Sequence, residues 1–296
     1  MKIKGSKEDF FFDIFNYILM TTILFITLYP FWYILVVSFN EGSDAARGGI
    51  YFLPRIFSLN NYKAVFQNTT LIDAFIITIA KTILGTTLHV LFTGIIAFAM
   101  GHKDLIGRRF YMMFGAVTMF FSGGLIPYYL LIRDLHMRNT IWVYIIPAMF
   151  SFWDMIIMMT FFKELPSELS ESAKIDGAEE LRIFWSVILP LSMPILATMA
   201  LFNGVGQWND FFTGVIFIDK QKLLPIQTVL YKIVAENTAS TMLMQVNLPD
   251  KIAQRKITSE SIKLATMVVT TVPIICVYPF LQKYFVKGML IGSIKG

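Results

Sequence analysis

Long uncharged stretches alternate with short charged segments along the chain. Four stretches of about 20 residues or more contain no Asp, Glu, Lys or Arg, and two further apolar stretches contain only one or two charges. A bilayer core of about 30 Å is crossed by roughly 20 apolar residues of helix. Backbone polar groups in lipid must be satisfied within the segment, and the runs are too long for barrel strands, so each is predicted to be a helix. The six expected spans lie within residues 14–40, 71–100, 110–132, 141–162, 183–209 and 264–282.

Composition supports the same class. The chain of 296 residues is 56% hydrophobic and 15% charged, with a mean hydropathy of +0.63, whereas soluble domains carry about 25% charged residues. The first run is expected to be a retained span, because it exceeds a signal-peptide core and no small-residue cleavage site follows it. The single cysteine excludes an intrachain disulfide framework. The net charge is +5, and the basic residues lie in loops rather than along one stripe. This pattern indicates segments that flank membrane spans and argues against nucleic-acid binding.

Basic residues next to the spans predict the topology. They precede the first span, fill the loop after the second and follow the last, at Lys2, Lys4, Lys7, Lys103, Arg108, Arg109, Lys283 and Lys287. By the positive-inside rule, both termini and the charged loop 163–190 are cytoplasmic. Arg133 and Arg138 on the other side weaken the bias. Two long outer segments, about 39–70 and 219–258, remain, and the second is expected to contain a short amphipathic helix over 226–234.

The charged loop is patterned as two short helices. Pro166 and Glu168 are typical of a first helical turn, and the spacing of Leu165, Leu169 and Ala173 gives that helix an apolar face. Asp176 followed by Glu179 is a capping-box pattern that predicts a second helix. Gly177 allows a sharp joint between the two helices. A structured polar corner between spans indicates a docking surface for a protein in the aqueous phase.

This corner resembles a known motif. Glu-Ser-Ala at 171–173, then Gly177, Val187 and Leu189-Pro190 are similar to the EAA motif of permease subunits of ABC importers. Ser172 and Val187 replace the usual alanine and isoleucine, which are small steric changes. Further similarity at 121–127 and 284–288 is to carbohydrate permeases of the maltose-transporter type and to a complex-oligosaccharide subgroup, and the resemblance extends from about residue 14 onward.

The resemblance implies an all-α polytopic fold with six transmembrane helices, the type I ABC importer transmembrane-domain fold. It implies that residues 1–70 hold the cytoplasmic N-terminus, first span and outer loop. Residues 71–287 would form the permease core with a coupling loop at 164–190. Residues 288–296 would form a cytoplasmic tail, which the resemblance to maltose-transporter-type permeases implies reaches the ATPase pair. The implied ATPase-coupling residues are Glu168, Glu171, Ser172, Ala173, Asp176, Gly177 and Ala178.

The implied partners are a second homologous permease, a dimer of cytoplasmic ABC ATPases, an extracytoplasmic sugar-binding protein, membrane lipid and an oligosaccharide, complex or acidic. The chain has no G-x-x-x-x-G-K-[ST] phosphate loop, so no cofactor is expected and ATP would be hydrolysed by the partner. The expected location is a bacterial cytoplasmic membrane. No enzyme constellation or metal-ligand spacing is present. The alternative is a stand-alone secondary transporter driven by an ion gradient.

Polar side chains inside the fourth and fifth spans are candidates for the substrate pathway. Such residues usually face a bundle interior or a water-filled cavity, and an aromatic beside an amide suits a sugar ring. The candidates are Asn203, Gln207, Trp208, Asn209, Asp210, Trp153 and Asp154. Helix packing or capping explains them equally well, so both readings stay open.

Two further polar residues occur in the second span. Lys81 and His89 could form a proton relay, but we expect Lys81 to extend its charge to the membrane interface. His89 has no carboxylate nearby in sequence. Structural roles are therefore expected for both.

Overall fold

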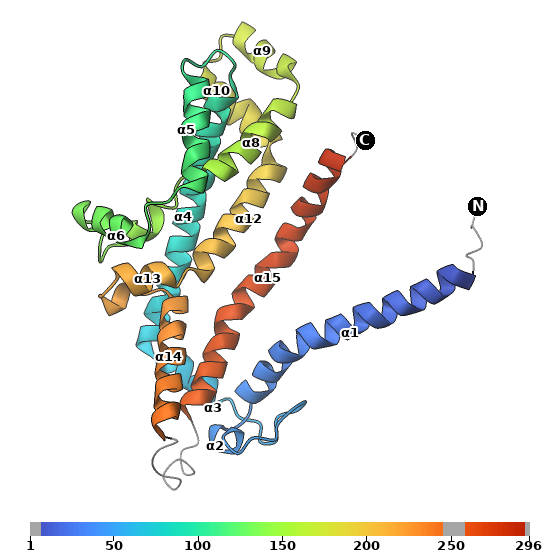
Figure 1. Ribbon diagram of the computed structural model, residues 1–296, viewed down its shortest axis with the longest axis vertical. Coiled ribbons are helices and arrows are strands. Elements are labelled where there is room, and N and C mark those ends of the chain that lie inside the picture. The colour runs from blue at the N-terminus through green and yellow to red at the C-terminus, as the bar shows by residue number, and fades with distance from the viewer. Residues whose placement is uncertain (1–6, 245–257, 294–296) are drawn as a thin grey trace. The chain divides into compact units, whose positions relative to one another are not determined.

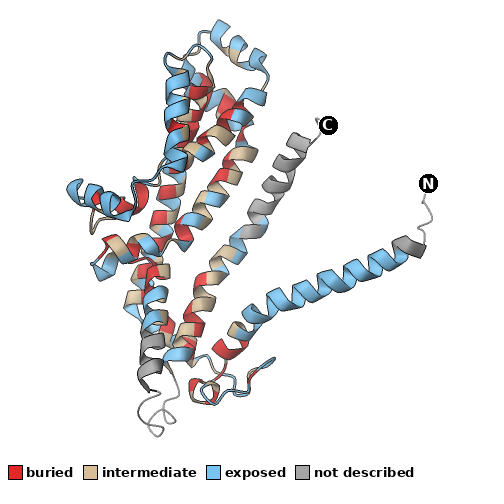
Figure 2. Ribbon diagram, in the orientation of Figure 1, coloured by how far each residue is buried: buried red, intermediate tan, exposed pale blue. Residues whose placement is uncertain are grey.

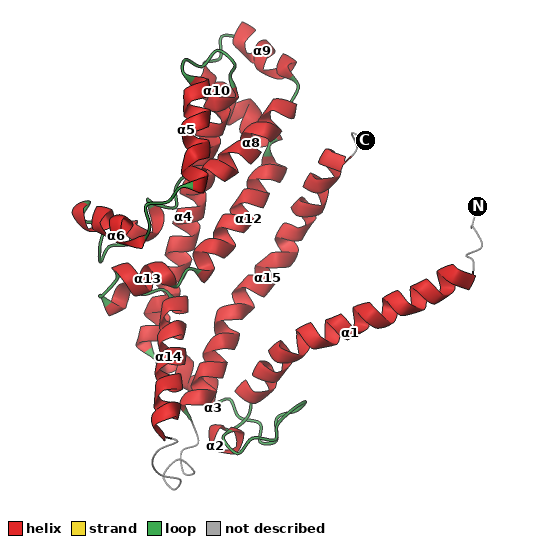
Figure 3. Ribbon diagram, in the orientation of Figure 1, coloured by secondary structure: helices red, strands yellow, loops and turns green. Residues whose placement is uncertain are grey.

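The structure is a computed structural model that describes residues 7–244 and 258–293. Within these ranges all regular elements are helices (Figures 1 and 3). The predicted all-α class is therefore confirmed. Lys2, Lys4 and the last three residues of the expected tail lie outside the described ranges.

The helices of the described residues vary widely in length. In chain order they are α1 (Lys7–Ser38), α2 (Gly42–Ala45), α3 (Asn60–Gln67), α4 (Thr69–Gly101), α5 (Arg108–Phe120), α6 (Leu125–Asp134), α7 (Trp142–Ile145), α8 (Phe152–Glu164), α9 (Ser167–Ile175), α10 (Glu180–Ile183), α11 (Leu189–Leu191), α12 (Met193–Asn209), α13 (Phe212–Phe217), α14 (Ile226–Met244) and α15 (Ser259–Ser293). A π-helical turn, Phe184–Ile188, joins α10 to α11, and a 3-10 turn, Gln221–Leu223, precedes α14.

Among the residues that the structure describes, three helices are long and apolar enough to cross a membrane, and up to five spans result if each bent pair counts as one. The long helices are Phe10–Ser38, Thr69–Gly101 and Ser259–Val277. The expected fourth span, about 141–162, is interrupted before α8, whose 13 residues are too few to cross a core of about 30 Å alone. The polytopic helical class holds, with fewer uninterrupted spans than the six expected.

Two expected spans are bent. The span expected over 110–132 breaks between α5 and α6 with an angle of 117°. Gly124, with φ 83°, lies at the break, where a left-handed backbone ends helical hydrogen bonding. The span expected over 183–209 bends by 83° at Ser192, between two helices that each contain a proline in the first turn.

The chain divides into two compact units. One comprises Met1–Asn68 with Lys232–Thr271, and the other comprises Thr69–Tyr231 with Val272–Gly296. In the first, Val36, Val37, Ile50 and Leu264 form a small core. The amide of Asn61 donates to the carbonyls of Ser38 (2.9 Å) and Asn40 (2.8 Å), which fixes the outer loop on the end of α1. Most of α1 is exposed (Figure 2).

The second unit has the larger core. Helix α4 packs against both α8 and α12. Methionine side chains fill much of the space between them, together with Ala97, Phe162, Ile183, Phe184, Ile188 and Leu196. Flexible thioether side chains fill irregular gaps between helices well. The α9–α10 corner lies at one end of this unit (Figure 1), and α8 and α12 of the same core also line a polar cavity.

Candidate functional site

The corner between α9 and α10 is held by its backbone. The N–H of Gly177 donates to Lys174 O (3.0 Å), and the N–H of Ala178 donates to Ala173 O (2.9 Å). These two bonds form a Schellman motif, in which the residue after the helix adopts a left-handed conformation. Gly177 has φ 81° and meets that requirement. The predicted sharp joint at Gly177 is confirmed.

The predicted capping box is wrong. Asp176 is the C-terminal cap of α9, and α10 begins after Glu179 with no side-chain capping bond. The Schellman motif already ends α9 and aims the chain into the next helix. Asp176 therefore belongs to the helix before the joint.

The corner presents most of its predicted residues to solvent. Glu168, Glu171, Ser172, Asp176 and Gly177 are exposed, whereas Ala173 and Ala178 are half-buried against the methionine-rich core. Ile175 is 86% exposed and Leu181 61% exposed. Small residues therefore seat the corner on its own protein, and acidic and apolar side chains face outward.

An ion-pair group braces the corner. Lys174 Nζ lies 2.7 Å from Glu180 Oε1, and His102 Nε2 lies 3.3 Å from Glu180 Oε2. The hydrogen bond from Lys174, with its charge and that of His102, lowers the pKa of Glu180 despite some desolvation. All three side chains are more than one-third exposed, so solvent screens the interaction.

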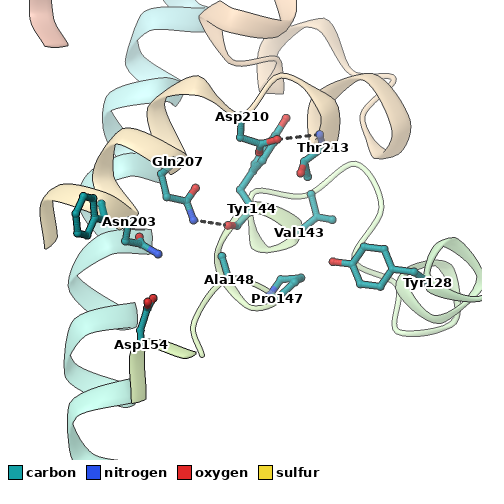
Figure 4. Close-up of a pocket in the computed structure, with 12 residues that line it drawn as sticks. Tyr128, Val143, Tyr144, Pro147, Ala148, Asp154, Asn203, Gln207, Asp210 and Thr213 are labelled. Carbon is teal, nitrogen blue, oxygen red and sulfur yellow. Dashed lines mark hydrogen bonds between the residues drawn. The ribbon is translucent and has the colours of Figure 1, made fainter. Parts of the chain in front are cut away.

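A polar cavity of about 470 Å³ opens among α6, α7, α8, α12 and α13 (Figure 4). Its walls combine carboxylates, amides, a threonine and aromatic rings. The lining residues are Tyr128, Val143, Tyr144, Pro147, Ala148, Asp154, Phe202, Asn203, Gly206, Gln207, Asp210 and Thr213.

Four of the seven predicted pathway residues line this cavity: Asp154, Asn203, Gln207 and Asp210. The other three lie elsewhere. Trp208 lines a separate apolar cavity of about 330 Å³, and Trp153 is 60% exposed. Asn209 donates to Val205 O (3.0 Å) and accepts from Gln227 (3.3 Å), as a residue near a helix end does.

Lys81 does not extend to the membrane interface. Its side chain is fully buried, and Nζ donates to Asp210 O (3.0 Å) and Asp210 Oδ2 (3.1 Å). The ammonium also lies 4.6 Å from the centroid of the Tyr144 ring. The prediction that Lys81 extends its charge to the membrane interface is wrong. A carboxylate, a carbonyl and the face of an aromatic ring stabilise the ammonium inside the protein in place of water.

His89 also has an acidic partner. One ring nitrogen, Nδ1, lies 2.8 Å from Ala148 O, and Nε2 lies 2.9 Å from Asp154 Oδ2. The carboxylate that is missing near His89 in sequence comes from α8. Each of the two carboxyl groups that line the cavity thus contacts a side-chain nitrogen from α4.

No sequence pattern predicted the aromatic residues that line the cavity. Tyr144 connects several elements, because its carbonyl accepts from Gln207 Nε2 (3.1 Å) and its hydroxyl donates to Leu223 O (3.1 Å). Tyr128 lies in α6, just after the Gly124 break. The glycine pair Gly123-Gly124 was the one sequence feature nearby that could have hinted at a break, but it did not lead to a predicted bend.

Among the described residues, no three His, Cys, Asp or Glu side chains lie close enough to hold a metal ion.

The chain matches, over residues 3–291, the family described as "Binding-protein-dependent transport system inner membrane component". It is 40% identical to Protein LplC of Bacillus subtilis (strain 168) over 295 residues, which cover 99% of this chain and 97% of that protein. It is 34% identical to the polygalacturonan/rhamnogalacturonan transport system permease protein YtcP of the same organism, covering 96% and 98%.

A solved structure agrees. A chain from the crystal structure of a bacterial ABC transporter involved in the import of the acidic polysaccharide alginate superposes with a TM-score of 0.87, at 28% identity, covering 96% of this chain and 100% of that one. The matched family is one of transporter permeases rather than enzymes. The exposed corner and the polar cavity lie within the matched residues 3–291. The chain belongs to the binding-protein-dependent transport system inner membrane components and is the permease subunit of an ABC importer.

Proposed function

We propose that this permease imports a carbohydrate, a complex or acidic oligosaccharide, and forms half of the translocation pathway. The observation that carries the mechanism is the exposed α9–α10 corner, which is rigid in its backbone and seated on the core of the helices that line the polar cavity. Relatives that import polygalacturonan/rhamnogalacturonan and alginate support the substrate class.

The corner transmits movement of the ATPases to the cavity. Ala173 and Ala178 pack on the cluster that contains Met158 and Phe184, and this cluster joins α9 and α10 to α4 and α8. When two ATPases close on ATP, the corner moves with them. Because packed cores move as rigid bodies, the lining helices shift between inward- and outward-facing states. The tail 288–296 reaches the ATPase pair as a second contact.

The proposed assembly contains a second, different permease, a dimer of cytoplasmic ABC ATPases and an extracytoplasmic sugar-binding protein. The membrane is a bacterial cytoplasmic membrane with both termini inside. Residues 1–70, 71–287 and 288–296 form the first span with its outer loop, the permease core and the tail. Family membership argues against an ion-gradient transporter, which would take up sugar in liposomes without ATPases.

The corner is tested by Gly177→Asp and by deletion of residues 171–177. We expect both changes to abolish co-purification of the ATPase while the chain remains in the membrane fraction. Glu164→Gln, on the exposed end of α8, is the matched control and should retain the ATPase. Retention of the ATPase by both altered chains would disprove docking at the corner.

Sidedness and substrate need separate measurements. Lys174 should be protected from an impermeant amine reagent in intact cells and labelled after lysis; labelling in intact cells would place the corner outside and end the proposal. Mass spectrometry of the sugar carried by the co-purified binding protein identifies the substrate. A non-carbohydrate ligand would contradict the substrate class.

A further inference from the structure

The polar cavity has acidic groups on its wall and no basic ones. Asp154 and Asp210 line it, each with a side chain 25% exposed. No Lys, Arg or His is among the lining residues. The basic groups, Lys81 and His89, stand behind the carboxylates, with side chains 0% and 2% exposed.

Lys81 compensates the charge of Asp210 from the protein side. Its ammonium donates to one carboxylate oxygen, Oδ2, and the other, Oδ1, accepts the backbone N–H of Thr213 at 3.0 Å. A carboxylate has about four acceptor positions, so Asp210 retains capacity toward the cavity.

The protons of the second pair follow from its geometry. A carbonyl oxygen only accepts, so His89 Nδ1 must carry a proton to bond Ala148 O. Nε2 then faces Asp154 Oδ2 at 2.9 Å. This contact requires one more proton between nitrogen and oxygen, since two lone pairs would repel. The pair is therefore neutral as a whole, whichever atom holds the proton, and a free oxygen of Asp154 remains an acceptor.

The other polar side chains that line the cavity are uncharged hydroxyls and amides. Gln207 Nε2 already donates a hydrogen bond to Tyr144 O. Asn203 Oδ1 is buried and meets no donor among the described residues. The Tyr128 hydroxyl and the aromatic ring of Phe202 also line the cavity, and aromatic faces pack against the C–H faces of sugar rings. The cavity thus suits a ring with several hydroxyl donors and no negative charge.

Resting on the proposed function, we propose that this cavity is a subsite for an uncharged, hydroxyl-bearing sugar unit, and that it excludes carboxylate groups. Sugar hydroxyls donate to Asp154 and Asp210. The wall offers a uronate carboxylate only the acceptor oxygens of Asp154 and Asp210 and no cation among the lining residues, an arrangement that disfavours binding. Any acidic groups of the substrate therefore face the partner permease. Lys81 and His89 are positioning residues that hold the two acceptors in place.

A cysteine reporter measures this selectivity directly. Asn203→Cys in a Cys276→Ser background places one thiol in the cavity of the complete, purified importer, and Thr213→Cys provides a second reporter should the first not assemble. Its reaction with cationic and anionic methanethiosulfonates is normalised to that of 2-mercaptoethanol in the same detergent. We expect the cationic reagent to be favoured several-fold, and Asp154→Asn, which keeps a hydrogen-bonding partner for His89, to reduce that preference.

Protection by sugars then separates the substrates. The probes are a trimeric oligogalacturonide and its methyl ester, which differ only in the charged groups. The ester should slow labelling and the free acid should not. Equal protection by the acid, protection by neither probe, or a preference for the anionic reagent would overturn the subsite. ATP-driven, binding-protein-dependent carbohydrate import by the unmodified importer tests the proposed function separately: if import persists without protection, only the subsite fails.

Discussion

The α9–α10 corner and the wall of the polar cavity are built in opposite ways. The bonds that shape the corner join residues three and five positions apart, and its predicted coupling residues are mostly exposed. The wall is assembled from contacts that span 129 residues between Lys81 and Asp210, 65 between His89 and Asp154, and 63 between Gln207 and Tyr144. The corner exposes acidic and apolar side chains to solvent, whereas the wall depends on charged groups that find their partners inside the protein.

This difference predicts different responses to substitution. A change in the wall leaves a buried group without its partner, and such groups carry large penalties. A change at the corner alters local backbone or a screened ion pair, so stability changes little while partner binding can change much. Wall variants should therefore lose stability first, and corner variants should lose ATPase coupling first.

Lys81→Met tests the wall and has the largest expected effect. It removes the ammonium that bonds Asp210 and lies over Tyr144, leaving a mostly buried carboxylate unpaired. Removing one partner of a buried pair costs about 3 kcal/mol or more. We expect a clear drop in the thermal unfolding temperature of the detergent-purified chain.

The double variant Lys81→Met/Asp210→Asn is the informative companion, because it removes both charges. It should recover a substantial part of the lost stability. Lys63→Met, at an exposed position in α3, controls for the loss of a lysine and should change little. A single variant as stable as Lys63→Met would show that the wall does not depend on the pair.

Gly177→Val tests the corner and has a smaller expected effect on stability. A Cβ at position 177 would meet no atom within 4 Å, so the change acts only through φ 81°. Left-handed backbone costs an ordinary residue about 1–2 kcal/mol. Distortion of the joint should weaken ATPase binding more than it lowers the unfolding temperature.

Gly177→Asn separates strain from side-chain bulk, because asparagine tolerates left-handed backbone better. It should bind the ATPase better than the valine variant, as measured by the amount co-purified. Equal loss in both variants would show that a side chain at this position blocks docking by itself, and that strain is not the cause.

The same contrast explains what the sequence could predict. Uncharged runs predicted helices because lipid leaves the backbone no other option, and the joint at Gly177 was readable because its determinants are adjacent. The breaks at Gly124 and Ser192 were not, since apolar composition does not report bends. The pathway residues could be predicted only in part. Polarity identified Asp154 and Asp210, but their partners Lys81 and His89 could be recognised only from the packing of α4 against α8 and α12.

Glu180→Gln gives the smallest expected effect and the sharpest pH signature. The bond from Lys174 lowers the pKa of Glu180 below its ordinary value of 4.5. A lowered pKa means that the pair stabilises the folded state above that ordinary value and that this contribution is lost as pH falls through the folded pKa. Because the carboxylate is 53% exposed, the contribution at pH 7 should be at most about 0.5 kcal/mol.

The measurement is the difference in unfolding temperature between the original chain and Glu180→Gln, followed from pH 7 down toward pH 3. The gap should narrow on the acid side and shrink in 1 M salt, where charges are screened within about 3 Å. Glu179→Gln, next to it and also exposed, should show a smaller gap. A difference in unfolding temperature that widens on acidification would mean that Glu180 acts through its neutral form. Packing by Ala173 and Ala178, and not charge, would then stabilise the corner.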